Sequence, residues 1–194
     1  MNLDSLFSDQ PVLETERLVL RRLNIYDAAE YHAVASDPLV SVHLKKGHHT
    51  GMDETLRFLE TVQTKFTSRK AYNWGVVERE SEMVIGRVNL FGFDPDNESG
   101  EMGFVISRAH WNKGLSTEAA SMVLDYSFRT VKLNRVIARC NEENIGSERV
   151  MQKLGMQYEG LLRENVKING QFINQKQYAI VKQNFNRKKE PANV

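Results

Sequence analysis

Apolar and polar positions along this chain follow two periods, and the shorter period predicts strands. In residues 14–23, Leu18 and Leu20 alternate with charged residues, which is the pattern of a strand with one buried face. Three short segments rich in β-branched and aromatic residues follow one another later, and they predict an antiparallel meander. Asn169 and Gly170 predict a tight hairpin turn near the C-terminal end. The predicted strands cover residues 14–23, 72–79, 83–94, 100–107, 134–140, 159–168 and 171–183.

The longer period, with apolar residues three and four positions apart, predicts four helices. Asn24 and Thr50 are each followed three residues later by an aspartate, as N-cap residues often are. Asn144 has the position of another N-cap, and Gly155 has that of a glycine that ends a helix. The predicted helices cover about residues 24–36, 50–69, 116–128 and 144–155.

The resulting order, β-α-α-β-β-β-α-β-α-β-β, predicts one mixed α/β domain of the α+β type. Its sheet is expected to have about seven strands, mostly antiparallel, with helices packed on it. We expect this domain over residues 12–185. An N-terminal extension (1–11) precedes it, and a polar C-terminal tail (186–194) follows it.

Composition narrows the class of protein. The 26 Lys and Arg residues nearly balance the 25 Asp and Glu residues, so no strong field favours nucleic acid or a membrane surface as a partner. The one cysteine, Cys140, has no partner for an internal disulfide or a cysteine-based zinc site, which favours a reducing compartment. The N-terminus lacks a signal-peptide pattern, and no apolar run approaches the ~20 residues that span a bilayer. We therefore expect a cytoplasmic protein.

The segment HWNKGLSTEA (110–119) places Lys113, Gly114 and two hydroxyl residues directly before a predicted helix. It matches neither the phosphate loop G-x-x-x-x-G-K-[ST] nor the dinucleotide fingerprint G-x-G-x-x-G. A tight turn at Gly114 followed by a helix start leaves backbone N–H groups unpaired, and these favour an anion. The alternative is that Gly114 only shapes the turn and Ser116 only caps the helix. This segment alone leaves both interpretations open.

The residues W-N-K-G-L-S-T-E-A (111–119) resemble motif A of the GNAT superfamily of acetyltransferases. The closest form is the W-G-x-G-Y-A-T-E-A of the Rim-type branch, which includes ribosomal-protein N-terminal acetyltransferases. Three further stretches resemble that branch in the same order: L-E-T-E-R-L-V-L-R-R-L (13–23), G-E-M-G-F-V-I (100–106) and the motif B-like residues 133–156. The resemblance covers about residues 12–182. It implies a GNAT fold, with helices on both faces of the sheet and splayed central strands.

The resemblance also implies an activity: transfer of the acetyl group of acetyl-CoA directly to a primary amine, without a metal. In this family the pyrophosphate lies on the amides of the motif A loop. The pantetheine arm pairs with the strand before that loop, inside the splay. By correspondence, the cofactor-binding residues are Phe104, Val105, Ile106, Trp111, Asn112, Lys113, Gly114, Leu115, Ser116, Thr117 and Asn144.

The chain departs from the family pattern at several positions. Trp111 and Asn112 replace the usual Gln or Arg and Gly, and Ser116 replaces a Gly or Ala. Met156 stands where Phe is common, which is an apolar exchange. Met151 replaces a tyrosine that many members use as the general acid for the leaving thiolate. A thioether donates no proton, so another group or a water is required here.

Two side chains are candidates for the chemistry, because aminolysis of a thioester needs a neutral amine and a stabilised thiolate. Ser147 lies three residues after Asn144, where the Rim-type branch places a serine near the CoA sulfur; its alternative role is to support the helix start. Glu101 is the candidate base if burial raises its pKa, and its alternatives are a structural ion pair or a solvated carboxylate. Glu164 is the reserve base. Asn174 occupies a place where relatives often carry Asp.

The other residue types with possible chemistry have simpler interpretations. His43, His48 and His49 lie between the first two helices without helical ligand spacing, so exposed loop residues are favoured over a metal site. His110 is expected in a turn, and Trp74 in the core.

The leading hypothesis is an acetyl-CoA-dependent N-acetyltransferase that acts on a protein N-terminal amine of the ribosomal-protein type. One alternative is a small-molecule amine as the acceptor. Another is a non-catalytic acyl-CoA-binding sensor protein, which the loss of the tyrosine at Met151 mildly favours. Acetyl-CoA and an amine are the expected partners, and the protein is expected to be a monomer or a homodimer.

Overall fold

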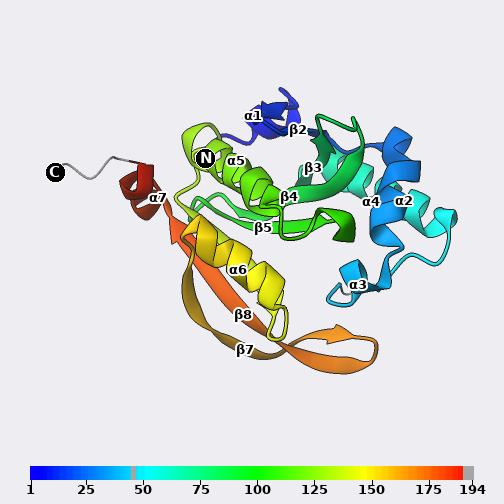
Figure 1. The fold of residues 1–194 in the computed structure, drawn as a ribbon. Helices are drawn as coiled ribbons and strands as arrows, with labels where there is room; N and C mark the ends of the chain where they lie inside the picture. The colour runs from blue at the N-terminus through cyan, green and yellow to red at the C-terminus, as the bar shows by residue number, and fades with distance from the viewer. Residues whose placement is uncertain (45–46, 190–194) are drawn as a thin grey trace.

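An eight-stranded sheet with the order β1-β2-β3-β4-β5-β6-β8-β7 runs through the computed structural model, which describes residues 1–44 and 47–189 (Figure 1). All neighbouring strands are antiparallel except β5 and β6, which are parallel. The predicted mixed, mostly antiparallel sheet is therefore confirmed. The strands are β1 (Leu13–Glu14), β2 (Leu18–Arg22), β3 (Ala71–Glu78), β4 (Val84–Asp94), β5 (Ser99–Ile106), β6 (Arg135–Asn141), β7 (Gln157–Ile168) and β8 (Gln171–Val181).

The prediction of one strand over residues 14–23 is wrong, because the chain turns back on itself there. The Thr15 hydroxyl accepts a hydrogen bond from the Leu18 N–H (2.9 Å), and the Thr15 N–H donates to the Leu18 carbonyl (2.9 Å). A threonine hydroxyl that bonds to nearby backbone in this way competes with strand pairing. After the turn, β2 pairs with β1, with Leu20 opposite Leu13. This turn accounts for the eighth strand.

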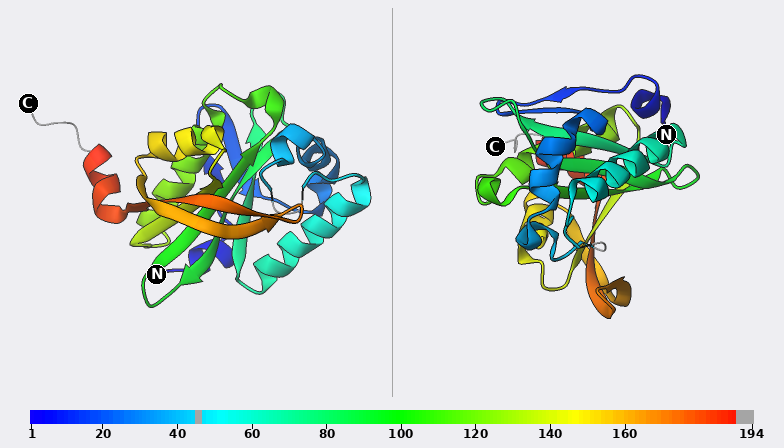
Figure 2. Two further views of the ribbon diagram at one scale, coloured as in Figure 1. Left: turned by 90° about the horizontal axis from the view of Figure 1, so that it is seen from below. Right: turned by 90° about the vertical axis from the view of Figure 1, so that its right-hand side faces the viewer.

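Helices α5 and α6 lie on one face of the sheet, and α2 and α4 lie on the other (Figures 1 and 2). This confirms the arrangement that the family resemblance implies. The sequence pattern does not predict α1 and α3, because they are too short to show a clear apolar period, or α7, because Phe185 is its one apolar residue. The predicted strand 171–183 is too long, since β8 ends at Val181 and residues 182 and 183 begin α7. The helices are α1 (Asp4–Phe7), α2 (Ala28–Ala35), α3 (Pro38–Ser41), α4 (Met52–Thr67), α5 (Leu115–Arg129), α6 (Ile145–Leu154) and α7 (Lys182–Lys189), with 3₁₀ turns η1 (Ile25–Asp27) and η2 (Arg108–His110).

Both ends of the described chain pack on the sheet. Leu6 and Phe7 of α1 are buried in the main hydrophobic cluster, together with Trp74, whose predicted core position is confirmed. Helix α7 continues past the predicted domain boundary at Phe185, which is buried in the same cluster. The last five residues of the predicted polar tail, 190–194, lie outside the described residues. No helix in the described part of the chain combines the length and the apolar character needed to span a bilayer.

Asn24 and Thr50 are the two predicted N-caps with an aspartate three residues later, and only the prediction for Asn24 is confirmed. Asn24 forms a capping box with Asp27, although the helix that it opens is the η1 turn before α2. Thr50 is not a cap, since Gly51 has the N-cap position of α4. The Thr50 N–H instead donates to the Glu54 carboxylate (2.6 Å), so the acidic residue of the first turn of α4 reaches back to the chain before it.

The parallel strands β5 and β6 separate after a short contact. They pair only over Ser99–Glu101 and Arg135–Ile137. Beyond that contact, β5 stays paired with β4 as far as Ile106 and β6 stays paired with β8 as far as Asn141, so a gap opens between β5 and β6. Helices α5 and α6 follow these two strands and therefore begin at the same edge of the sheet, beside the gap. The implied splay of the central strands is confirmed.

Candidate functional site

The segment between η2 and α5 presents a row of unpaired backbone N–H groups. Asn112 (φ 61°) and Gly114 (φ 80°) adopt left-handed conformations on either side of Lys113. Such alternation turns successive N–H groups toward one side and forms an anion-binding nest. Among the described residues, no N–H of residues 112–117 has a hydrogen-bond acceptor, and the first bond of α5 runs from the Glu118 N–H to the Gly114 carbonyl (3.0 Å). Six N–H donors and the positive end of the α5 dipole are therefore available to an anion.

Side chains from the β1–β2 turn brace this loop. Arg17 donates through Nε (2.8 Å) and Nη2 (2.5 Å) to Glu118 Oε2 and through Nη1 to the Lys113 carbonyl oxygen (3.0 Å). The Thr15 hydroxyl donates to the other Glu118 oxygen (2.5 Å). Burial acts to raise the pKa of Glu118, but the bonds from Thr15 and Arg17 outweigh it and hold this pKa below its ordinary value. This brace, formed by Thr15, Arg17 and Glu118, bonds to the Lys113 carbonyl of the loop and leaves the loop N–H groups without acceptors.

Two departures from motif A have a structural reason. Asn112 stands where the family has glycine, and asparagine tolerates the left-handed region better than most other residues. Trp111 is 42% exposed, and its indole N–H donates to the carbonyl of Ile106 at the end of β5 (3.0 Å). The remaining predicted loop residues form the first turn of α5: Leu115, which is buried, and Ser116 and Thr117, which are half-buried.

Strand β5 directs alternate backbone groups into the gap. The Ser107 N–H donates to a carbonyl of β4 (2.8 Å), and successive residues of an antiparallel strand bond to opposite sides. Val105 is therefore turned toward β4, whereas Phe104 and Ile106 are turned toward the gap. The Ile106 carbonyl already accepts the bond from Trp111. The groups that remain for an added strand-like ligand are the Ile106 N–H and both backbone groups of Phe104.

The start of α6 brings Asn144 and Ser147 together. Asn144 Oδ1 accepts a hydrogen bond from the Ser147 N–H (3.0 Å), which leaves the Asn144 amide nitrogen without a partner among the described residues. The half-buried Ser147 hydroxyl likewise has no bond within that part of the chain. Met151, one turn later, is fully buried in the main cluster. The helix cap uses only the backbone of Ser147, so its hydroxyl remains available for chemistry.

Glu101 lies on the opposite face of β5 from the buried Met102 and forms an ion pair with Arg139 of β6. The Glu101 side chain is 20% exposed, and burial raises its pKa above the ordinary value although Arg139 opposes this. Arg139 Nε also donates to Gln177 of β8 (2.9 Å), whose amide donates to Glu159 (3.2 Å). Glu101 therefore combines two of the predicted environments: it is partly buried with a raised pKa, and it is in an ion pair.

The reserve base has different surroundings. Glu164 is exposed in a bulge of β7 (φ 52°), on the β7–β8 hairpin that projects from the body of the sheet (Figure 2). The Glu164 N–H donates to Asn174 Oδ1 (2.9 Å), and the Asn174 amide donates to Glu142 (2.9 Å). Asn174 thus ties the bulge to the loop after β6. The exposed Glu164 carboxylate therefore lacks the burial of Glu101.

Of the three histidines of the predicted loop, His48 is exposed, whereas His43 and His49 are half-buried, so the prediction of exposed residues is confirmed only for His48. His49 and His32 both hydrogen-bond to the Thr55 hydroxyl (2.8 and 2.7 Å). The His43 carbonyl accepts a bond from Asn141 Nδ2 (3.2 Å), which brings the segment after α3 over the end of β6. Across the described ranges, no group of three or more His, Cys, Asp or Glu residues is placed to hold a metal ion.

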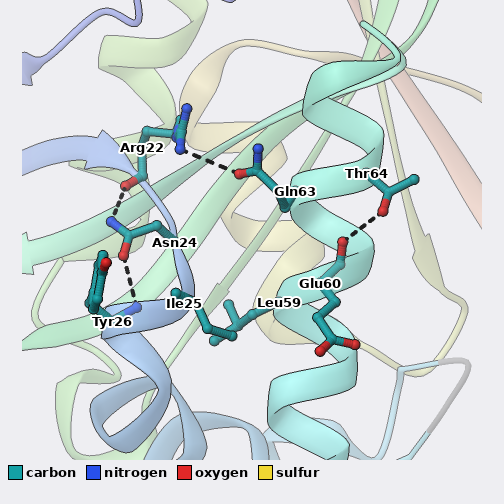
Figure 3. Close-up of a pocket in the computed structure, with 8 residues that line it drawn as sticks. All are labelled: Arg22, Asn24, Ile25, Tyr26, Leu59, Glu60, Gln63 and Thr64. Carbon is teal, nitrogen blue, oxygen red and sulfur yellow. Dashed lines mark hydrogen bonds between the residues drawn. The ribbon is translucent and has the colours of Figure 1, made fainter.

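Two open hollows lie outside the gap. One of about 460 Å³ lies between η1 and α4, where Tyr26 is exposed and Arg22 donates to Gln63 (3.3 Å; Figure 3). The other, of about 420 Å³, lies between α2 and η2, and its His110 is hydrogen-bonded to Ser107 (2.5 Å). Neither hollow is lined by residues 112–117 or by Glu101.

Sequence reasoning misses three residues of this site: Thr15 and Arg17, which brace the loop, and Arg139, which pairs with Glu101. Each acts on a partner far away in the chain, so periodicity and local spacing do not reveal it. The only signal is the segment L-E-T-E-R-L (13–18), whose resemblance to the Rim-type branch extends beyond what a strand requires.

Comparisons with known proteins give consistent results. Residues 17–157 match the family model described as acetyltransferase (GNAT) domain. An uncharacterized N-acetyltransferase, p20, of Bacillus licheniformis is 30% identical over 173 residues, which cover 89% of this chain and 97% of that protein. Among solved structures, the ribosomal-protein-S5-alanine acetyltransferase from Vibrio fischeri has 19% identity and a TM-score of 0.78, over 93% of this chain and all of that chain (100%). Spermidine N-acetyltransferase from Vibrio cholerae, in complex with CoA and spermine, has 22% identity and a TM-score of 0.77, over 89% of this chain and 99% of that chain. The last two likenesses show the fold alone.

Proposed function

Because this chain belongs to the GNAT family of N-acetyltransferases, we propose that its loop of residues 112–117 binds the pyrophosphate of acetyl-CoA. The observation that carries this proposal is the row of six unpaired N–H groups at the start of α5. An anion at such a helix start needs no metal, since the N–H groups and the helix dipole balance its charge.

The gap between β5 and β6 fits the pantetheine arm of the same ligand. That arm contains two amides, and the free backbone groups of Phe104 and Ile106 suit an added strand of this kind. The unbonded Asn144 amide nitrogen, at the start of α6, supplies a further donor beside the gap.

Acetyl-CoA supplies the acetyl group as a thioester, and the chain supplies the groups around it. Glu101, whose pKa burial raises, accepts the proton of the attacking amine directly or through a water. A backbone N–H facing the gap polarises the acetyl carbonyl. The Ser147 hydroxyl hydrogen-bonds to the departing sulfur, a role that the buried Met151 does not fill.

For the acceptor, the site favours a protein N-terminal amine over a polyamine. The sheet face opposite α5 and α6 carries the carboxamides of Asn89 and Gln177 and the guanidinium groups of Arg87 and Arg139, while Glu101 is already paired with Arg139. Carboxamides match the peptide groups that follow an N-terminal amine, because they both donate and accept hydrogen bonds. A polyamine would require unpaired carboxylates on this face.

Release of free thiol from acetyl-CoA tests this function directly. The panel contains peptides with a free N-terminal Ser or Ala, the same peptides with a blocked N-terminus, spermidine, and small primary amines. We expect the free peptides to give the highest kcat/KM and the blocked peptides to give none. Faster turnover of spermidine or of a small amine would refute the peptide acceptor. Tight CoA binding without any acceptor would favour the sensor alternative.

A further inference from the structure

Arg87 of β4 is a partly buried cation held only by neutral partners. Its Nε donates to the Tyr31 hydroxyl (2.8 Å), and its Nη1 donates to Asn73 Oδ1 (3.2 Å) and Asn89 Oδ1 (2.9 Å). The ring of Phe58 lies 5.3 Å from the guanidinium carbon, on the side of α4. These contacts fix the plane of the guanidinium group.

The charge of Arg87 is not balanced by any carboxylate in residues 1–44 and 47–189. Two other half-buried arginines on this face, Arg21 and Arg139, each have a carboxylate partner. The Nη2 group of Arg87 donates no hydrogen bond within the described residues. A partly buried cation without an anion is costly, and the free Nη2 group can donate a charge-assisted hydrogen bond to a carboxylate.

The register of the sheet places Arg87 on the same face as Glu101, two residue pairs away along β4 and β5. Arg87 is opposite Val105, Asn89 is opposite Gly103, and the next pair on this face contains Glu101. Two residues of a strand advance about 6.7 Å and neighbouring strands lie about 4.8 Å apart, so the backbones of Arg87 and Glu101 are about 14 Å apart. Gly103 lies between them without a side chain.

The side of Arg87 that faces away from β5 is covered. Tyr31 and Asn73 are buried there, with 3% and 5% exposure, under α2 and α4. On the side of β5, the Asn89 carboxamide fills the space over Gly103, since a Cβ at this position would lie 2.8 Å from Asn89 Oδ1. The same Asn89 oxygen accepts the bond from Arg87 Nη1, so Arg87, Asn89 and Glu101 follow one another as polar residues along this face of the sheet.

We propose that Arg87 determines specificity by binding a carboxylate of the amine acceptor. This inference rests on the proposed N-acetyl transfer and names its substrate class: an amine with an anionic group on the order of 10 Å or less from the nitrogen. In a peptide, an acidic side chain at the second residue meets this distance. The α-carboxylate of a free amino acid presents the same chemistry, and the experiment separates the two sources.

The test compares two peptides that differ only at the second residue, Ser-Asp and Ser-Asn, in the thiol-release assay. We expect the wild-type protein to favour the Asp peptide about 10-fold in kcat/KM, mainly through KM, because hydrogen bonds to charged groups are stronger than neutral ones. In Arg87→Gln this ratio falls to about one, and Arg87→Lys keeps part of it, since lysine retains a positive charge but not the planar guanidinium group.

A matched control separates recognition from support of the fold. Tyr31→Phe removes the Nε partner of Arg87 and keeps the cation, so it should keep most of the preference for Asp even if its melting temperature falls. Serine against serinamide, assayed in parallel, reports whether a free amino acid is the source of the carboxylate. Preference for serine with no turnover of either peptide would assign the free amino acid.

The outcomes for this inference and for the proposed function differ. Equal kcat/KM for the charged and neutral members of both pairs would overturn the role of Arg87 and leave N-acetyl transfer intact. If no amine is acetylated, the proposed function fails. Calorimetric binding of the Asp and Asn peptides to the protein saturated with CoA then decides the inference separately, and equal affinity or no binding of both peptides rejects it.

Discussion

The two ends of the β5–β6 gap are built in different ways. At the loop end, the proposed contacts are N–H groups of six consecutive residues, held by a brace from the β1–β2 turn. At the acceptor end, they are side chains from β4, β5, β6 and β8, among them Arg87, Glu101 and Arg139. The first end depends on backbone conformation, and the second depends on which side chains the sheet register brings together.

This difference explains how one fold can keep its cofactor while it changes its acceptor. A row of backbone donors survives most substitutions, provided that residues such as Gly114 keep their conformation. A face made of side chains changes its chemistry with every exchange. Function therefore has to be inferred from the side-chain end of the site and not from the fold.

The largest effect is expected at the acceptor end, from Glu101→Gln. Removal of the base should lower kcat/KM about 100-fold and leave the Kd for CoA nearly unchanged. With Glu101 as the proposed base, activity of the wild-type protein requires its ionised form, so kcat/KM is expected to fall as pH falls through the raised pKa of this group. Arg139→Gln should move this acidic limb to higher pH, because Arg139 holds the pKa down. If the limb persists in Glu101→Gln, another group is the base.

At the loop end, Gly114→Val should weaken CoA binding about 100-fold, because valine is strained at φ 80° and the loop must change conformation to relieve this strain. Isothermal titration calorimetry with CoA measures the change. Gly170→Val is the matched control, since Gly170 has a similar φ (85°) in the distant β7–β8 turn. An unchanged Kd in Gly114→Val would exclude this loop as the pyrophosphate site.

Ser147 lies in the first turn of α6, beside the gap. Ser147→Ala should lower kcat about 10-fold with little effect on the Kd for CoA. The substitution keeps the backbone N–H that Asn144 caps, so the start of α6 is preserved. Steady-state kinetics with the preferred peptide measure the effect. Wild-type kcat in this variant would reduce Ser147 to its role at the helix start.

The smallest effect is expected from the brace. Arg17→Met should weaken CoA binding about fivefold, because the exposed pair with Glu118 contributes modestly and the loop keeps its turn residues. Arg129→Met is the control, since Arg129 forms an exposed ion pair with Asp125 at the other end of α5. Equal Kd values for both variants would show that the brace does not affect the loop.

The brace also predicts a dependence of stability on pH. The folded-state pKa of Glu118 lies below the ordinary 4.5, so its contribution to the free energy of unfolding is present above pH 4.5 and is lost as pH falls through the folded-state pKa. Glu118→Gln lacks this contribution at every pH. Urea unfolding of both proteins should therefore show a difference at pH 7 that shrinks as the solution is acidified. A difference in the free energy of unfolding that stays constant with pH would show that ionised Glu118 does not contribute to stability.

Sequence patterns predict the local elements of this fold well and its long-range contacts poorly. The helix around Asn144 and the hairpin at Asn169 and Gly170 follow from capping and turn chemistry within a few residues. The turn at Thr15 does not, since alternation in residues 14–23 continues through it. The pattern identifies the loop before α5, but the left-handed Asn112 becomes clear only from the backbone.

Long-range contacts are even harder to predict at the proposed acceptor end of the gap. Glu101 can be placed on one face of its strand from alternation, but its pairing with Arg139 depends on where β5 and β6 separate. Arg87 has no local signal at all, because its partners Tyr31 and Asn73 come from other elements of the chain. The side chains that we propose to decide the acceptor are thus the ones that a single sequence reveals least.

The two tryptophans of the chain occupy opposite environments, and this has a practical consequence. Trp74 is fully buried, whereas Trp111 is 42% exposed and touches the end of β5 through its indole N–H. A ligand on the neighbouring loop changes the solvent around one indole and leaves the other untouched. The unlabelled protein therefore carries its own fluorescent reporter of ligand binding with a built-in constant reference, and Trp111→Phe identifies the responsive signal.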